Sequence, residues 1–412
     1  KFRLFNFLKL KTSKGKHLEV INTGFHNTNS GPDFLNARIL VDNILWVGDV
    51  EIHIVSSDWY AHQHHNDVNY QTIVLHVVYE EDQIIENSSG VPLFCLELKG
   101  LIPDEYITKY DSIYHSSSDL PCSFAIGGLD DFFWVPYTER LLVDRLEEKI
   151  SKIRAIFLEV NKDYQECFYR LLSYVLGLKI NSEAMLCMAE KTSFLTLLKH
   201  RTNRTYIEAI LFGQSGLLNR RYDDAYPKKL KKEYQFFSEK YKLIPISSFQ
   251  WKFFRLRPNS FPTLRISYLA DFIQKSNLIF ESLFNFNRVD HLLHFFNLNL
   301  SEYWKSHYMF DKKSKTISKS LGKATINSIL INAVLPFCYF YAKNKDKDQM
   351  IMNILDSYSH LKPEKNKIVQ YFIDAGVKLN SASGTQALIH LHQNYCISRK
   401  CLNCRVFNKI VK

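Results

Sequence analysis

The segment Gly48–His53 (GDVEIH) carries the residue types best suited to chemistry in this chain. Apolar residues flank it on both sides and predict a strand, on which successive side chains alternate between two faces. Asp49, Glu51 and His53 therefore share one face. The other face is expected to be buried and carries the apolar residues of the strand, Val50, Ile52 and Ile54. Two neighbouring carboxylates repel each other unless a cation or a proton lies between them, so the pattern predicts a divalent-metal site.

A histidine cluster follows in the polar stretch 56–70. His62, His64 and Asp67 have an HxHxxD spacing that is similar to the metal-binding loop of metallo-β-lactamase-like hydrolases. Imidazole ligands suit Zn²⁺, so these three residues are candidate additional metal ligands. The alternative is a polar loop packed on its neighbouring aromatic residues, and for His76, which lies in an apolar strand, a hydrogen-bonded core histidine.

The cysteines near the end of the sequence form the second metal-type pattern. Cys396, Cys401 and Cys404 have a CxxxxCxxC spacing that is typical of zinc or iron–sulfur ligation. Three thiolates need a fourth ligand, for which Cys122 and the histidines just before Cys396 are candidates. The alternative is a set of reduced cysteines at a helix end.

Three arginines surround two prolines in the segment RLRPNSFPTLR. Arg255, Arg257 and Arg265 are candidate phosphate-binding residues, because a guanidinium group binds phosphate through two parallel hydrogen bonds. The same residues could instead pair with acids inside the protein, for example with Glu208.

The composition indicates a globular protein with an uneven charge distribution. The net charge is +11, yet residues 1–120 carry 9 Lys and Arg against 16 Asp and Glu. A basic body attached to an acidic module fits an enzyme that holds a polyanion, so nucleic acid is the expected partner, with DNA favoured. No apolar run is long enough to predict a membrane span, and the opening KFRLFNFLKLK is not typical of a signal peptide. Eight scattered cysteines favour a reducing compartment, which we expect to be the cytoplasm.

Two kinds of periodicity divide the chain. Strand-like apolar runs are predicted at 17–22, 37–41, 44–55, 72–79 and 91–98. Helical patterns begin near residue 137 and recur to residue 375. The sequence therefore predicts an α/β module over residues 1–120 and a mainly helical, basic domain over residues 121–412.

Seven motifs resemble those of an uncharacterised bacterial family defined as a domain of unknown function. They are GPDF at 31–34, GDVEIH at 48–53, SSDW at 56–59, HQHHND at 62–67, LHVVY at 75–79, RLRPNSFPTLR at 255–265 and CISRKCLNC at 396–404. The resemblance extends nearly from end to end, and it implies a family without implying an activity.

Residues 17–80 also resemble the PD-(D/E)XK nuclease superfamily, with Pro32-Asp33 before one strand and Glu51-x-His53 on the next. This resemblance implies a restriction-endonuclease-like mixed sheet in which Asp33 and Glu51 bind Mg²⁺ or Mn²⁺, with Asp49 as an extra ligand. Such ions lower the pKa of an attacking water and stabilise charge on the scissile phosphate. His53 stands where the superfamily usually has lysine, which implies a base or a metal ligand at that position.

Some nucleases of that superfamily fasten the chain end to the catalytic domain with three C-terminal cysteines and one upstream cysteine. The resemblance implies that Cys122 joins the three C-terminal cysteines in such a clasp. The predicted function is metal-dependent hydrolysis of DNA phosphodiester bonds, with Asp33, Asp49, Glu51 and His53 as catalytic residues. One alternative is a non-catalytic nucleic-acid-binding or scaffold protein with a degenerate nuclease fold. A second is a zinc-dependent hydrolase that uses the HxHxxD cluster.

Overall fold

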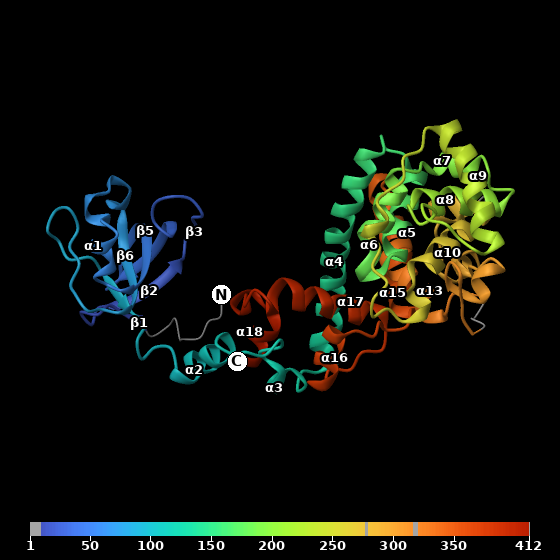
Figure 1. Cartoon of the computed structure of the whole chain (residues 1–412). Coiled ribbons are helices and arrows are strands. Elements are labelled where there is room, and N and C mark those ends of the chain that lie inside the picture. Colours follow the sequence, from blue (N-terminus) through green and yellow to red (C-terminus); the bar gives the residue numbers. More distant parts are fainter. Residues whose placement is uncertain (1–9, 277–278, 316–319, 412) are drawn as a thin grey trace. The chain divides into compact units, whose positions relative to one another are not determined.

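The computed structural model describes residues 10–276, 279–315 and 320–411 (Figure 1). Most of the opening segment KFRLFNFLKLK, which is not expected to be a signal peptide, lies outside these residues. The described chain forms two compact units, which are treated separately below. The first comprises the described part of residues 1–124 together with 399–412, and the second comprises residues 125–398.

The first unit contains a mixed sheet with the strand order β1-β2-β4-β5-β6-β7, and β3 pairs with β4. Its strands are β1 (Leu10–Lys11), β2 (His17–Asn22), β3 (Phe25–His26), β4 (Phe34–Val41), β5 (Ile44–Val55), β6 (Ile73–Glu80) and β7 (Cys95–Glu97). Pairing is antiparallel from β1 to β5 and parallel from β5 to β7. The predicted α/β module is therefore confirmed, and the predicted bounds of β2 and β5 match those observed.

The connection between β5 and β6 is helical, as parallel neighbouring strands require a crossover. It consists of α1 (Asp58–Ala61) and two single 3₁₀ turns, His64–Asn66 and Val68–Tyr70. Trp59 of α1 is 2% exposed and packs with Ile73 and Ile85. The connection therefore covers the face of β5 that carries Glu51 and His53.

The expectation that the apolar side of β5 is uniformly buried is wrong. Val50 is buried, but Ile52 is 44% exposed and Ile54 is 73% exposed. Glu51 and His53 are only 6% and 8% exposed. The reason is that the helical connection packs on the polar face of the strand, so the polar side chains lie inside.

The first unit also holds two helices that are distant in sequence, α2 (Asp104–Tyr114) and α18 (Arg405–Val411). The rings of Tyr110 and Phe407 lie 5.7 Å apart between centroids. Arg399 donates hydrogen bonds from Nη2 to the carbonyl oxygens of Ser116 and Ser118, at 2.6 and 3.1 Å. The last residues of the chain thus belong to the same unit as the sheet.

The second unit is mainly helical, as the sequence predicts. Its helices are α4 (Asp131–Glu159), α5 (Tyr164–Leu176), α6 (Leu178–Glu190), α7 (Phe194–Leu198), α8 (Arg204–Gln214), α9 (Ala225–Tyr241), α10 (Pro262–Lys275), α11 (Ile279–Phe284), α12 (Asp290–Leu293), α13 (Lys323–Ile329), α14 (Leu335–Asn344), α15 (Asp348–His360), α16 (Lys367–Asp374) and α17 (Ala382–Leu391). Short α3 (Ser123–Ile126) spans the boundary between the units, and β8 (His307–Met309) pairs with β9 (Lys312–Lys313).

One helical run in the described chain, Lys323–Asn344, is long and apolar enough to cross a membrane. It joins α13 and α14 through a π-helical turn, Leu330–Val334. Asn332 and Pro336 therefore lie within the helical run and do not interrupt it. Of its most apolar 18-residue window, 61% is buried inside the protein. The run packs as a core helix of the second unit.

Candidate metal centre

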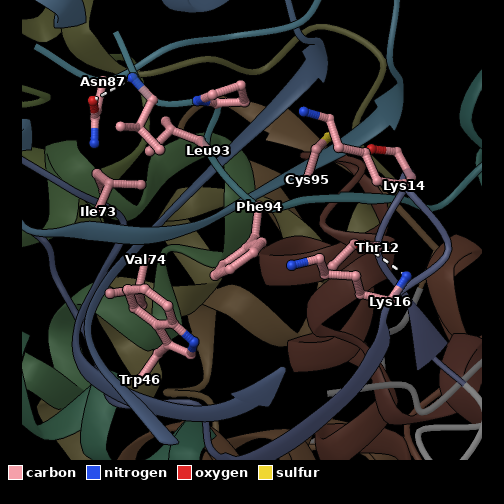
Figure 2. Close-up of a pocket in the computed structure, with 13 residues that line it drawn as sticks. Thr12, Lys14, Lys16, Trp46, Ile73, Val74, Asn87, Leu93, Phe94 and Cys95 are labelled. Atoms are coloured by element: carbon pink, nitrogen blue, oxygen red, sulfur yellow. Dashed lines mark hydrogen bonds between the residues drawn. The ribbon is translucent and has the colours of Figure 1, made fainter. Parts of the chain in front are cut away.

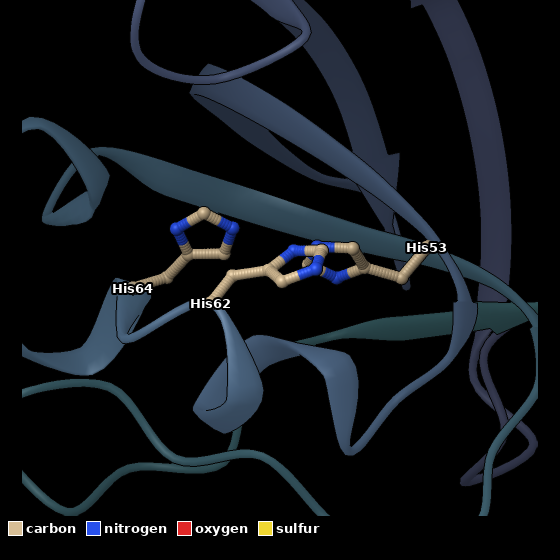
Figure 3. A group of neighbouring side chains, drawn as sticks. All are labelled: His53, His62 and His64. Carbon is tan, nitrogen blue, oxygen red and sulfur yellow. The ribbon is translucent and has the colours of Figure 1, made fainter.

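Four side chains with metal-binding atoms meet on the covered face of the sheet. Glu51 and His53 project from β5, whereas His62 and His64 come from the helical connection that packs on it. One ring nitrogen from each of the three histidines lies within 4.8 Å of the other two (Figure 3). The crossover therefore brings the HxH pair of the sequence onto the polar face of the strand.

Three pairs of ligand atoms in this cluster lie near the spacing expected around one ion. Glu51 Oε1 is 3.6 Å from His53 Nε2 and 3.4 Å from His64 Nε2. His53 Nε2 is 3.2 Å from His62 Nδ1. Ligands at roughly 2.1 Å from a tetrahedral metal are separated by roughly 3.4 Å from one another. The observed distances agree with that value.

A buried nitrogen atom without a hydrogen-bond partner also indicates a metal ion at this position. His64 Nε2 is buried and has no hydrogen-bond partner among the described residues, although the Glu51 carboxylate is close. A buried polar atom without a partner costs free energy, and an ion at this position would satisfy it. The side chains present therefore fit a metal ion. A set of three imidazoles and one carboxylate suits Zn²⁺ or Mn²⁺ better than Mg²⁺, which prefers oxygen ligands.

The electrostatics of the cluster favour the neutral imidazoles of His53 and His64. Burial, followed by repulsion from neighbouring histidines, lowers the pKa of His64 to about 4 and also lowers the pKa of His53. Burial, followed by the nearby charge of Asp33, raises the pKa of Glu51 to about 7. Neutral imidazoles are the metal-binding form, and a metal cation would replace the proton on Glu51.

His76 supports the cluster from the neighbouring strand. It is 1% exposed, and its Nε2 lies 2.8 Å from His53 Nδ1. Trp59 packs against its ring, with 5.4 Å between the centroids. His76 is therefore a core histidine, as one reading of the sequence has it, and it also contacts a candidate ligand. Tyr70, which the sequence analysis does not identify, stacks on His64 at 3.8 Å between ring centroids.

Asp33 lies beside Glu51, at the start of β4. The Asp33 amide donates to Glu51 Oε2 at 3.0 Å, and the Ile52 amide donates to Asp33 Oδ2 at 3.0 Å. Asp33 and Glu51 are thus on adjacent strands and electrostatically coupled. Asp49 has a different environment, because its two oxygens accept from the Asn36 amide and the Thr72 hydroxyl, at 2.9 and 2.5 Å. These bonds fasten a bulge of β4 and the entry to β6.

Asp67, the last residue of the HxHxxD pattern, caps a turn. Its Oδ1 accepts from the backbone amide and the side-chain amide of Asn69, both at 2.9 Å. Only His62 and His64 of that pattern join the cluster within the described residues. His65 is exposed and contacts the ring of Tyr60 instead.

Three of the four cysteines of the predicted clasp, Cys122, Cys401 and Cys404, belong to the first unit. Cys401 and Cys404 are 8% and 7% exposed and are joined by a tight turn in which the Cys404 amide donates to the Cys401 carbonyl. Burial, together with the nearby thiols of Cys404 and Cys401, raises the pKa of Cys122 to about 12. Cys396 is also buried and belongs to the second unit.

The three arginines considered for phosphate binding lie in unlike environments. Arg255 and Arg257 are exposed, and Arg255 lies over the ring of Phe254. Arg265 is 4% exposed, and its Nε and Nη1 atoms have no hydrogen-bond partner in the described chain. Glu208, the suggested internal partner, pairs with Arg204 instead.

Comparison with curated proteins and with solved structures finds no match. A family model described as "Protein of unknown function (DUF2851)" matches residues 1–367. The match spans the sheet, the candidate metal centre and most of the helical unit, and the chain therefore belongs to the DUF2851 family.

Proposed function

We propose that Glu51, His53, His62 and His64 form the divalent-metal centre of a hydrolase, and that its substrate is a nucleic-acid phosphodiester, with DNA favoured. The observation that carries the proposal is the convergence of Glu51 Oε1, His53 Nε2 and His64 Nε2 at 3.4 to 3.6 Å. Mn²⁺ or Zn²⁺ suits this set of ligands best.

The cluster divides into a buried part and an exposed part, which bears on catalysis. Glu51 and His53 are buried and His64 is half-buried, whereas His62 is exposed. A catalytic metal keeps a position open for water or substrate, usually with three protein ligands. Glu51, His53 and His64 supply three ligands, and His62 lies on the solvent side where a substrate would enter. A bound ion at this position would lower the pKa of a water and stabilise charge on the phosphoryl group.

Two further features support a phosphodiester as the substrate. Asp33 and Glu51 lie side by side on adjacent strands of a mixed sheet, in keeping with the resemblance to PD-(D/E)XK nucleases. The chain as a whole has a net charge of +11, which favours a polyanionic partner. His53 occupies the position of the usual lysine, and its place in the cluster favours a metal ligand over a cationic side chain.

A zinc hydrolase with another substrate is the second candidate, favoured by the entry of His62 and His64 into the cluster. A nucleic-acid-binding protein without activity is the third. The described cysteines form no disulfide, so for each candidate we propose a reducing, cytoplasmic location.

The test is cleavage of labelled single-stranded, duplex and branched DNA by the full chain with Mn²⁺, Zn²⁺ or Mg²⁺. Glu51→Gln removes a ligand with little change in shape, and His65→Ala is the matched control because His65 lies in the same turn outside the cluster. Cleavage by the wild type and the control, but not by Glu51→Gln, would support the proposal. Equal cleavage by Glu51→Gln would overturn it. Metal binding without cleavage of any DNA would favour the second candidate.

A further inference from the structure

A cavity of about 310 Å³ lies in the first unit next to the strands that carry the metal centre (Figure 2). Its walls come from the turn between β1 and β2, the first residues of β5 and β6, and the segment that leads into β7. The volume is at the small end of ligand-binding pockets and suits a single nucleotide-sized group.

Two aromatic rings form one wall of the cavity. Trp46 and Phe94 meet edge to face, with 5.1 Å between the ring centroids and 79° between the ring planes. Trp46 is 40% exposed, although it lies in a strand with a buried face. Ile73 and Leu93 also line the space and add to its apolar surface. Flat, apolar walls of this kind bind the rings of nucleobases, which stack on aromatic side chains.

Two lysines lie at the rim of the cavity, on a turn that hydrogen bonds fix in place. The Ser13 amide donates to the Cys95 carbonyl at 2.9 Å, and the Lys16 amide donates to Thr12 Oγ1 at 3.1 Å. Lys14 and Lys16 are exposed, and neither forms an ion pair with the described residues. Lys16 Nζ lies 5.5 Å from the centroid of the Phe94 ring. The cavity therefore joins an aromatic wall to two available positive charges.

The cavity and the metal centre share strands β5 and β6, and Trp46 lies on the face of β5 opposite Glu51 and His53. Cys95, which lines it, pairs in register with His76 of β6. His76 in turn contacts His53 of the cluster. Ile73, another lining residue, packs against Trp59 in the connection that carries His62 and His64.

We propose that this cavity is a nucleotide subsite, in which Trp46 and Phe94 stack on a base of single-stranded nucleic acid and Lys14 and Lys16 bind its phosphate. The proposal rests on the proposed function for the identity of the ligand as nucleic acid. It adds that the strand is held through an unpaired base bound to the same sheet that carries the metal centre, so that single-stranded or frayed DNA is the preferred substrate.

The test is binding of a fluorescein-labelled oligothymidylate to the full chain in EDTA, measured by anisotropy over a salt series. Trp46→Ala should weaken binding about 5- to 100-fold through the lost stacking. Lys14→Ala/Lys16→Ala should reduce the slope of log affinity against log salt by about 1.4, since each phosphate contact on a single strand contributes about 0.7. Trp46→Phe, which keeps a ring, should retain most of the affinity.

The controls are Phe25→Ala, an aromatic residue 75% exposed in the same unit, and Lys99→Ala/Lys109→Ala, which removes the same charge elsewhere in that unit. Affinities and salt slopes of the cavity variants equal to those of these controls would overturn the subsite, even if Glu51-dependent cleavage is observed. Binding that depends on Trp46 and both lysines, without cleavage by any variant, would support the subsite while the proposed function failed.

Discussion

His53 Nδ1 lies 2.8 Å from His76 Nε2, across the parallel strands β5 and β6. A neutral imidazole carries one proton, so donation from His53 Nδ1 to His76 leaves the lone pair of His53 on Nε2. That nitrogen is the one that faces Glu51 and His62. With the His53 proton on Nδ1, the bond to His76 would hold His53 in the tautomer that can bind a metal. Burial lowers the pKa of His76 to about 4.

Removal of His76 should therefore weaken metal binding although His76 is not a ligand. We expect His76→Phe, which preserves the contact with Trp59, to lower Mn²⁺ or Zn²⁺ affinity about 10- to 100-fold. Isothermal titration of the full chain measures this effect. His65→Ala should bind as the wild type does, and an unchanged affinity in His76→Phe would contradict the role assigned to His76.

The four ligands should not be equivalent. Replacement of Glu51, His53 or His64 by alanine removes one of the three inner ligands, and elemental analysis should then show loss of the bound ion. His62→Ala should retain the ion with an affinity reduced about 10- to 100-fold, because exposed His62 only completes the site. Complete loss of metal from His62→Ala would indicate a closed four-ligand site of the structural type.

Glu51 should make the stability of the metal-free protein depend on pH. Its pKa is raised from 4.5 to about 7 by burial and by Asp33, so the folded protein binds a proton that the unfolded chain releases. This contribution is fully present below pH 4.5 and is lost as the pH rises through 7, by about 3 kcal/mol at most at about 1.4 kcal/mol per pKa unit.

The measurement is thermal unfolding in EDTA between pH 5 and pH 8. Glu51→Gln, which cannot ionise, should become more stable than the wild type as the pH rises. Added Mn²⁺ should restore the stability of the wild type at pH 8 and leave that of Glu51→Gln unchanged. A constant difference between the two proteins across this range would show that the Glu51 carboxyl is not buried and protonated as described.

Much of the fold follows from local sequence pattern. The apolar runs at 17–22 and 44–55 predict β2 and β5 with their observed bounds. The alternation of side chains along β5 also predicts that Glu51 and His53 lie on the same face of the sheet. Which face is buried does not follow, since it depends on where the helical connection packs.

The complete candidate site depends on contacts between distant segments, which periodicity does not report. In the sequence, His76 is a histidine within an apolar strand pattern. Only the parallel register of β5 and β6 brings it to His53. Asp67 matches a ligand spacing, yet its carboxylate caps the turn Val68–Tyr70. Trp46, Lys14 and Lys16 belong to no sequence motif. Only the pairing of the strands places them around one cavity.

The cysteines of the first unit provide the last prediction, a second metal site of different chemistry. Cys122 and the Cys401–Cys404 turn are far apart in the sequence but belong to one unit, and burial, together with the nearby Cys404 and Cys401 thiols, raises the pKa of Cys122. A bound metal ion would deprotonate the thiols and tie the C-terminal residues to the sheet module.

We expect purified protein to contain zinc or iron beyond the ion held by Glu51, and this fraction should persist in Glu51→Gln. Cys401→Ser and Cys404→Ser should lose it, and Cys187→Ser, a cysteine of α6 in the other unit, should not. Visible absorption from thiolate-to-iron charge transfer would identify an iron–sulfur cluster. A colourless protein with stoichiometric zinc would identify a zinc site. Because the clasp joins residues 399–412 to the sheet module, its loss should also expose that segment to proteolysis at lower protease concentrations. Equal metal content in all three cysteine variants would show that these thiols hold no ion.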